Sequence, residues 1–335
     1  MSGVEDVTDP FTGELTRVAE TLGVAPFTPI IARLRRPVRV AVLGRPGVGR
    51  GRVEAALRHR SVPVAPSGAD ADVDVLVIAE TAKPEELAVV RSARRPLLIL
   101  LTKADLAGKG PGGPIAVARR RAIAVERLTG VPVIAVVGLL AALECDGLDP
   151  ELLAALRVFV TEPPDLTGVE VFVEQPHSVE RDVRARLLAR LDRFGIAHAV
   201  LALAGGTEPQ RLGGYLSALG NLDEVTAALE TASARVRYLR LHAAVVELRA
   251  LAARSDAVAV SDLLADDVTV LATMGAAVEV IEAAGLPVDR GDTAAAHLDR
   301  AIRWRRYCRG PVNDLHRRCG ADIARGSLRL LARMQ

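Results

Sequence analysis

The sequence predicts a doubly wound α/β domain with a parallel sheet, followed by an α-helical bundle. Apolar runs of strand length alternate with helical segments between residues 38 and 137, as parallel strands joined by crossover helices require. Beyond about residue 150 the pattern is helical almost to the end. The 335 residues are enough for two domains, and half of them are hydrophobic, which excludes general disorder.

The order of elements follows from these apolar runs. Four segments rich in Val, Ile and Leu are predicted to be strands: 38–43, 73–79, 97–101 and 131–137. Helices are expected between them at 52–60, 84–94 and 115–128. Residues 1–37 have apolar positions at helical spacing and form a helical lead-in, and the run 169–173 is a candidate for one extra strand.

The C-terminal half is predicted to contain long packed helices. Apolar residues recur there at alternating steps of four and three: Val225, Leu229, Ala232, Val236, Leu239, Ala243, Val246, Ala250 and Ala253. Such a stripe indicates the buried face of one long helix. Further apolar residues beside the stripe widen this face, and part of it should pack against the N-terminal lead-in and the helix expected over 262–285: Leu241, Val245, Leu248 and Leu251. A second helix is expected over 262–285, followed by two shorter basic helices. We assign 1–37 to the lead-in, 38–165 to the α/β domain and 166–335 to the bundle.

Charge and cysteine content narrow the function classes. Residues 300–335 hold ten Arg against Asp314 and Asp322, a net charge of +8, so the rest of the chain has a net charge of −6. Three scattered cysteines (Cys145, Cys308 and Cys319) give neither a disulfide framework nor a zinc pattern. No apolar stretch is long enough for a membrane span, and no secretion signal opens the chain. We therefore expect a cytoplasmic protein.

A glycine-rich turn is the first motif with chemical meaning. It lies between a predicted strand and a predicted helix, the context of a phosphate-binding loop, and reads Gly44-Arg45-Pro46-Gly47-Val48-Gly49-Arg50-Gly51. The pattern G-x-x-x-x-G-K-[ST] is met at its outer glycines, Gly44 and Gly49. Arg50 replaces the lysine that reaches the phosphates, and Gly51 replaces the hydroxyl that holds Mg²⁺. The structural alternative is a glycine turn that binds no ligand.

The second motif is Thr102-Lys103-Ala104-Asp105, which follows the predicted strand 97–101. It matches [NT]-K-x-D, in which the Asp carboxylate accepts hydrogen bonds from two adjacent N–H groups of guanine and thereby rejects adenine. The Lys stem packs beneath the base. Lys103 is one of only three lysines among 43 basic residues, which favours a specific reason for it. The alternative is a salt-bridged loop at a strand end.

On these two motifs the chain resembles the Ras-like P-loop GTPases, in particular the Era and dynamin-like branch. A third stretch, 131–140, is similar to the last GTPase strand and its base-contacting loop, with Val137-Gly138 in place of the usual Ser-Ala or Ser-Gly pair. The helical lead-in and the long C-terminal helices also look like those of bacterial dynamin-like proteins. The resemblance implies a nucleotide site formed by the following residues: Gly44, Gly47, Val48, Gly49, Arg50, Gly51, Thr102, Lys103, Asp105, Val137 and Gly138.

The departures from the family pattern predict a degenerate GTPase-like domain, one without the groups that hydrolysis of GTP requires. The interval between Gly51 and the strand at 73–79 contains neither a D-x-x-G sequence nor a threonine that could bind Mg²⁺. Phosphoryl transfer depends on such groups for positioning and charge neutralisation. We expect weak binding of GTP or GDP or none, no bound Mg²⁺, no other metal site and no catalytic residue.

The resemblance also implies a mode of action. Dynamin-like proteins often associate as neighbouring pairs, so we expect a homodimer or a heterodimer with an active dynamin-like GTPase. The basic C-terminus leaves an anionic membrane surface open as a partner, and with it a membrane-peripheral location, whereas nucleic acid is not expected. Two alternatives remain: a slow authentic GTPase that uses Arg50 in place of the lysine, and a helical adaptor that binds no nucleotide.

Overall fold

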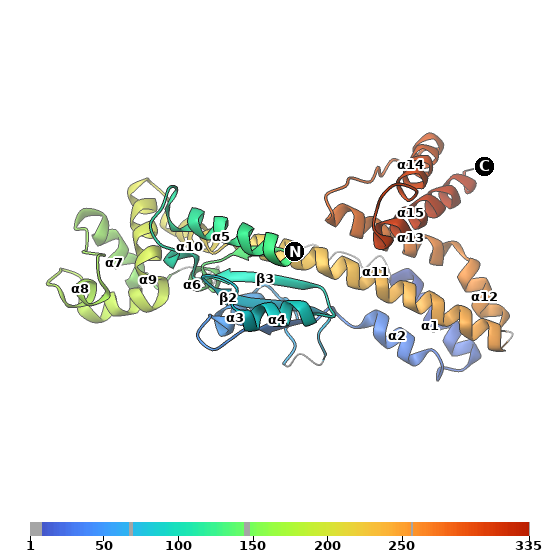
Figure 1. The fold of residues 1–335 in the computed structure, drawn as a ribbon, viewed down its shortest axis with the longest axis horizontal. Helices are drawn as coiled ribbons and strands as arrows, with labels where there is room; N and C mark the ends of the chain where they lie inside the picture. The colour runs from blue at the N-terminus through green and yellow to red at the C-terminus, as the bar shows by residue number, and fades with distance from the viewer. Residues whose placement is uncertain (1–8, 67–69, 144–147, 256, 335) are drawn as a thin grey trace. The chain divides into compact units, whose positions relative to one another are not determined.

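The structure, a computed structural model, describes residues 9–66, 70–143, 148–255 and 257–334 (Figure 1). The chain divides into two compact units, one formed by Met1–Val38 with Glu230–Gln335 and the other by Arg39–Leu229. The second unit contains a four-stranded parallel sheet and is called here the α/β unit; the first is called the helical unit. An α/β domain joined to a helical region is therefore confirmed. The boundaries expected from the sequence, at residues 37 and 165, stay a prediction.

The sheet has four parallel strands in the order β1-β2-β3-β4. Their bounds are Val40–Leu43 (β1), Val73–Ala79 (β2), Leu97–Thr102 (β3) and Val133–Ala135 (β4). All four predicted strands are present, the first and last shorter than expected. Val64 forms a parallel bridge with Val40, on the side of β1 away from β2. Because all strands are parallel, the loops that follow β1, β3 and β4 lie at one edge of the sheet.

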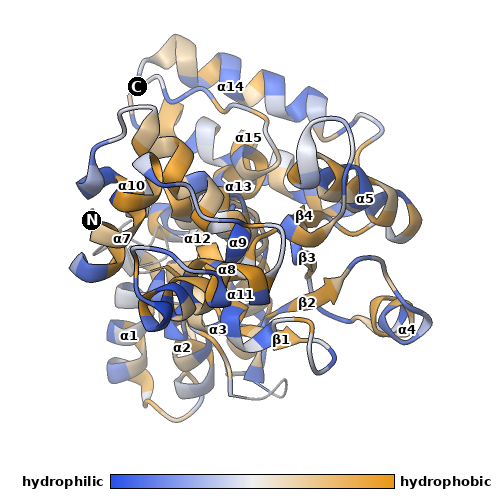
Figure 2. Ribbon diagram, turned by 90° about the vertical axis from the view of Figure 1, so that its left-hand side faces the viewer, coloured by the Kyte–Doolittle hydropathy of each residue, from blue (hydrophilic) through white to orange (hydrophobic). Residues whose placement is uncertain are grey.

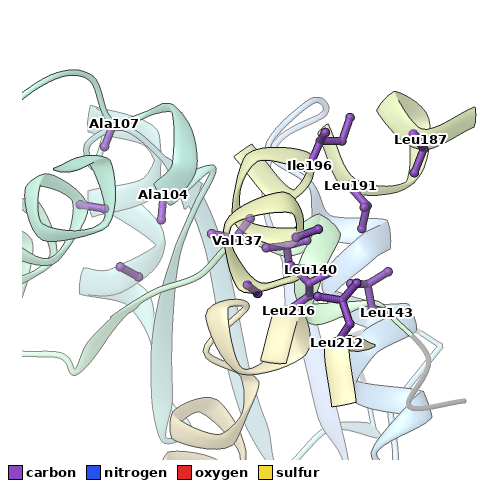
Figure 3. Close-up of a cluster of buried hydrophobic side chains, with 14 of the residues drawn as sticks. Ala104, Ala107, Val137, Leu140, Leu143, Leu187, Leu191, Ile196, Leu212 and Leu216 are labelled. Atoms are coloured by element: carbon purple, nitrogen blue, oxygen red, sulfur yellow. The ribbon is translucent and has the colours of Figure 1, made fainter. Parts of the chain in front are cut away.

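Helices of the α/β unit connect and cover these strands. They are α3 (Arg50–His59), α4 (Pro84–Ser92), the 3₁₀ turn η2 (Ala104–Leu106), α5 (Gly113–Thr129), α6 (Gly138–Ala141), α7 (Pro150–Thr161), α8 (Val169–Glu174), α9 (Arg181–Ala204) and α10 (Pro209–Leu219). Alternate strand residues, among them Leu76, Ile78 and Ile99, share one buried cluster with residues of α5, α6, α7, α9 and α10. Figure 3 shows the part of this cluster formed by Val137, Leu140 and the helices around them.

The extra strand predicted at 169–173 is wrong, because these residues form the helix α8. Only Phe172 of this helix is buried, and its ring packs edge-to-face on Phe159 of α7 with centroids 5.8 Å apart. A strand would need a neighbour for its backbone hydrogen bonds, and no described strand lies beside this segment. The contact with α7 therefore overrides the strand preference of the three valines.

The helical unit is built from both ends of the chain. Its helices are α1 (Asp9–Leu22), α2 (Thr28–Arg35), most of α11 (Leu222–Ser255), α12 (Val258–Ala265), α13 (Asp267–Ala283), α14 (Ala294–Tyr307) and α15 (Asp314–Ala332). The single helix expected over 262–285 is interrupted at Asp266, whose carboxylate caps α13 by accepting from the Val268 amide at 2.7 Å. The expected packing of the N-terminal lead-in on the long helix is confirmed, since Phe11 and Leu15 share a buried cluster with Leu241.

The buried face of α11 differs from the predicted stripe over its second half. Val225, Leu229 and Val236 are buried, but Leu239 and Val246 of the same stripe are 40% and 49% exposed. The buried residues there are instead Tyr238, Leu241, Ala244, Val245 and Leu248, which pack with α1, α2 and α13. The predicted stripe has alanine at every second or third position. The larger side chains remove more apolar surface from water, so that face is buried in preference. In Figure 2, blue polar and orange apolar residues are interspersed along helices such as α5.

Two leucines on this helix give a matched test of the observed face. We expect Leu241→Ala to lower the free energy of unfolding by about 2–5 kcal/mol, because a fully buried leucine leaves a cavity. Leu239→Ala should cost less than about 1 kcal/mol, since this side chain is already 40% exposed. Urea denaturation followed by far-ultraviolet circular dichroism measures both. Equal losses of stability in the two variants would show that Leu239, in the stripe predicted from the sequence, is as buried as Leu241.

Candidate nucleotide-binding site

Three predicted segments meet at the carboxyl edge of the sheet: the glycine loop after β1, the Thr102–Asp105 segment after β3, and Val137–Gly138 after β4. The hydroxyl of Thr102 lies 2.5 Å from the carbonyl oxygen of Val48 and 3.0 Å from that of Ile78, and its single hydrogen is shared between them. The amide of Ala104 donates to the carbonyl of Val136 at 3.2 Å. The structure therefore brings together the segments that sequence reasoning selected separately.

The glycine loop has the backbone of an anion cradle. Gly44, Gly47 and Gly49 have φ angles of +149°, +83° and +92°, which only glycine adopts readily. A Cβ atom at Gly44 would also lie 2.7 Å from the carbonyl oxygen of Val77 in the neighbouring strand. The amides of residues 47–51 have no hydrogen-bond acceptor among the described residues, and they lie at the N-terminus of α3. Free amides at a helix start attract an anion such as a phosphate.

Arg50 and Gly51, the two departures from the family pattern, are the first residues of α3. The Nε atom of Arg50 lies 3.5 Å from Oε1 of Glu54, one turn along the same helix. An exposed pair of this kind contributes only about 0.3–0.5 kcal/mol, so Arg50 can leave Glu54 for an anion at little cost. Gly51 is exposed, and a Cβ atom there would meet nothing within 4 Å. A serine would therefore fit at position 51, but glycine offers no hydroxyl to a metal ion.

Arg45, also in the glycine loop, is held by a buried carboxylate that sequence reasoning missed. Its Nε donates to Oε1 of Glu86 at 2.9 Å, and the other oxygen of Glu86 accepts from the Lys83 amide at 2.8 Å. Glu86 is only 2% exposed, and its hydrogen bond raises the pKa of Arg45. This pair ties the loop to the start of α4. The available signal was the sequence Lys-Pro-Glu-Glu, typical of a helix start whose third residue bonds back.

Lys103 and Asp105 stand at the start of the loop after β3. Lys103 has φ +58° and an exposed side chain, and Asp105 lies in η2, half-buried. Burial raises the pKa of Asp105, and the nearby carboxylate of Asp192 raises it further, while its own backbone amide, Arg52 and Lys103 oppose this shift. The Asp105 carboxylate therefore lies within electrostatic range of Arg52 in α3 and of Asp192 in α9.

Asp192 was not expected at the site, and its backbone is unusual. It interrupts α9 with φ +56° and ψ +173°, a region that a residue with a side chain rarely adopts. Its carboxylate accepts from the amide of Arg193 at 2.6 Å. Three residues later, Gly195 packs against Leu140, to which a Cβ atom would be 2.9 Å away. The helical pattern of residues 181–204 concealed this interruption.

Val137 and Gly138 connect the site to the core. Val137 is buried, and Gly138 opens α6, where a Cβ atom would lie 3.9 Å from the Cβ of Arg52. Leu140, two residues on, points into the cluster formed with Leu191 and Leu216 (Figure 3). The segment 137–138 thus lies beside Arg52 of α3.

Outside this edge of the sheet, the described residues offer no metal site, and the aspartates at the start of β2 have a structural role. No group of three or more His, Cys, Asp or Glu side chains there could hold a metal ion. Asp72 accepts from the backbone amide of Arg39, and Asp74 pairs with Arg95, so both aspartates fasten the start of β2. Cys308 and Cys319 are buried free thiols, and Cys145 lies outside the described residues. No described helix combines the length and the apolar character needed to cross a membrane.

Comparison of the chain with models of known protein families, with curated proteins and with solved structures gives no match.

Proposed function

We propose that this protein is a degenerate GTPase-like protein that binds guanine nucleotide weakly, does not hydrolyse it, and acts by associating with a partner. The observation that supports this most is the convergence of the two motifs at one sheet edge, with Thr102 bonded to Val48. The free amides at the start of α3 suit a phosphate, and the Asp105 carboxylate suits the N–H edge of guanine. The residues in these roles are those that the resemblance implied.

The site lacks the groups that hydrolysis requires. Gly51 offers no hydroxyl to Mg²⁺, and no threonine lies between Gly51 and β2. In that interval, residues 62–65 run beside β1, where Pro63 and Ala65 exchange hydrogen bonds with Val40. A sensor for the γ-phosphate and a group that positions the attacking water have no counterpart among these residues. Guanine nucleotide would therefore act as a ligand, with little dependence of its affinity on Mg²⁺.

Turnover of GTP should not exceed the background rate, and restoring two residues should not change this. We expect the double variant Arg50→Lys with Gly51→Ser to bind nucleotide more tightly, because position 51 has room for the hydroxyl. Its rate should stay at background, because neither substitution supplies a residue that positions water. A steady-state phosphate-release assay measures both proteins, with Glu54→Gln, which frees Arg50 without adding a metal ligand, as the control.

The slow authentic GTPase is the alternative that this assay addresses. It is favoured by the weak hold of Glu54 on Arg50, which leaves the guanidinium free to approach a phosphate. A steady-state rate that disappears in Arg50→Ala would establish this alternative and reject the proposal. No rate in either protein, together with weak binding of GDP, supports the proposal.

The partner would be a second copy of this chain or an active dynamin-like GTPase. Deleting residues 300–335 cannot test the association, because Trp304, Cys319 and Ile323 belong to the buried cluster of the helical unit. Substitutions on the surface of α14 and α15 are the appropriate test.

A further inference from the structure

An open groove of about 1070 Å³ is lined by residues of α14 and α15 and by Arg309 of the loop between them. Its apolar lining includes Leu298, Ile302 and Leu328, which are 44%, 41% and 52% exposed. The remaining apolar lining comes from alanines of both helices. Large apolar side chains that line an open groove between two helices are typical of the grooves into which an amphipathic helix packs.

Four arginines border this apolar lining: Arg305, Arg306, Arg309 and Arg325. All four are exposed, and their side chains make no hydrogen bond or ion pair within 4 Å to any described residue. The other charged groups of the groove are already engaged. Arg329 pairs with Asp267 at 3.0 Å, and Asp322 accepts from the hydroxyl of Tyr238 at 2.7 Å. Of the four arginines, Arg325 interacts electrostatically with Asp322, and the groove therefore combines an apolar lining with a border of excess positive charge.

The groove has a rigid base. On the inner sides of the two helices, Trp304, Cys319 and Ile323 are buried in the core of the helical unit. Gly320 allows close approach, because a Cβ atom there would lie 3.0 Å from the Cβ of Cys308 and 3.2 Å from the carbonyl oxygen of Trp304. The exposed side chains are thus presented by helices whose opposite sides are fixed by packing.

We propose that this groove binds one amphipathic α-helix of a partner protein, with an apolar face flanked by Asp and Glu. The apolar face would cover Leu298, Ile302 and Leu328, and the acidic flanks would pair with the four arginines. The α15 residues that line the groove extend over 321–332, about 17 Å, which matches about three turns of a partner helix. The proposal rests on the partner association proposed above, but it does not require nucleotide binding.

The shape and lining of the groove favour a partner helix over two other anionic partners, a lipid surface and a single-stranded nucleic acid. Insertion into a lipid surface needs apolar side chains that project beyond the charged ones, whereas here they line a hollow between two helices. Single-stranded nucleic acid binds through aromatic stacking, and the lining contains no aromatic residue. An amphipathic helix instead packs its apolar face against aliphatic side chains, such as the leucine, isoleucine and alanine side chains of this groove.

Fluorescence anisotropy of the full-length protein with a labelled helical peptide tests the proposal. The probe is a designed peptide of about 18 residues with leucines at helical positions i, i+3, i+4 and i+7 and glutamates beside them. A matched peptide has lysine at every glutamate. We expect micromolar binding of the acidic peptide at about 50 mM NaCl, at least a ~10-fold loss at about 0.5 M, and no binding of the lysine peptide.

Variants then localise the binding. Ile302→Ser with Leu328→Ser should weaken it at least ~10-fold, and Arg309→Glu should do the same at low salt. Arg318→Glu is the matched control, since Arg318 is an exposed arginine of α15 outside the groove, and it should have little effect. All of these positions are exposed, so circular dichroism should show an unchanged fold.

Three results would overturn the proposal: no binding of the acidic peptide at about 1 mM, equal binding of both peptides, or equal affinity in the groove and control variants. Binding of phosphatidylserine vesicles that is lost in Arg309→Glu, without peptide binding, would assign the surface to a membrane instead. Calorimetry with GDP separates this proposal from the nucleotide site. The groove variants should bind GDP as the unmodified protein does, so the two proposals can fail independently.

Discussion

Replacing Gly220 by alanine is expected to lower the free energy of unfolding of the α/β unit by about 2–3 kcal/mol, or more if the backbone cannot shift. Gly220 follows α10, and a Cβ atom there would lie 2.4 Å from the amide nitrogen and 2.6 Å from the Cα of Ala141. Both are backbone atoms of α6, so no side-chain rotation relieves the overlap. Urea denaturation followed by circular dichroism measures the loss.

Gly214, within α10, gives the matched control. It is exposed, and a Cβ atom there would meet nothing within 4 Å. Gly214→Ala should therefore stabilise the protein by about 0.4–1 kcal/mol, because alanine restricts the unfolded chain and favours a helix. Equal effects of the two substitutions would show that α6 and α10 do not approach each other as closely as described.

Gly220→Ala should also disturb the candidate nucleotide-binding site. The helix α6 begins at Gly138, directly after β4, so its displacement moves the segment 137–138. We expect Gly220→Ala to weaken binding of GDP under conditions where the protein is still folded. Gly214→Ala should leave that binding unchanged.

Asp105→Ala is expected to abolish binding of guanine nucleotide. In the proposed complex the carboxylate accepts from two N–H groups of guanine, and each hydrogen bond to a charged group contributes about 1.5–3 kcal/mol. Loss of both takes a weak site below detection. The control is Asp262→Asn, at an exposed aspartate of α12. Calorimetry with GDP checks the result; unchanged affinity in Asp105→Ala would remove the assignment of guanine specificity to this residue.

The raised pKa of Asp105 gives this prediction a dependence on pH. A carboxyl group with a raised pKa in the folded protein stabilises the fold at low pH, and this stability is lost as the pH rises through that pKa. Binding of guanine needs the ionised form, so affinity for GDP should fall on acidification at a higher pH than an ordinary aspartate would give. Asp105→Asn removes the charge but keeps the shape. It should bind no GDP, and at neutral pH it should be at least as stable as the unmodified protein.

The positions of the candidate site residues were largely predictable from the sequence. A β-branched run followed by glycines predicted β1 and its loop, and the apolar run 97–101 predicted β3, which extends to Thr102. Parallel strands place both loops at one edge, so their convergence follows from the strand assignment alone. Gly47 and Gly49 have left-handed φ angles, which explains why glycine stands at these positions of the loop.

The contacts that fix the site depend on tertiary packing and could not be read from the pattern. The burial of Glu86 against Arg45 depends on how α4 lies on the sheet, and the interruption at Asp192 lies three residues before the close contact of Gly195 with Leu140. In α11, periodicity correctly predicted a long helix with a wide apolar face. Over the second half of the helix, Leu241, Val245 and Leu248 of that face are buried, whereas Leu239 and Val246 of the central stripe are exposed, because the larger side chains bury more apolar surface.

Isothermal titration calorimetry of the full-length protein with GTP, GDP and ATP, each with and without Mg²⁺, tests the central claim most directly. We expect weak binding of both guanine nucleotides, the same heat with and without Mg²⁺, and no heat with ATP. The Asp105 carboxylate selects guanine, and Gly51 offers no hydroxyl to the metal. Equal affinity for ATP and GTP, or tight binding of GTP that requires Mg²⁺, would contradict the account of a degenerate GTPase-like site.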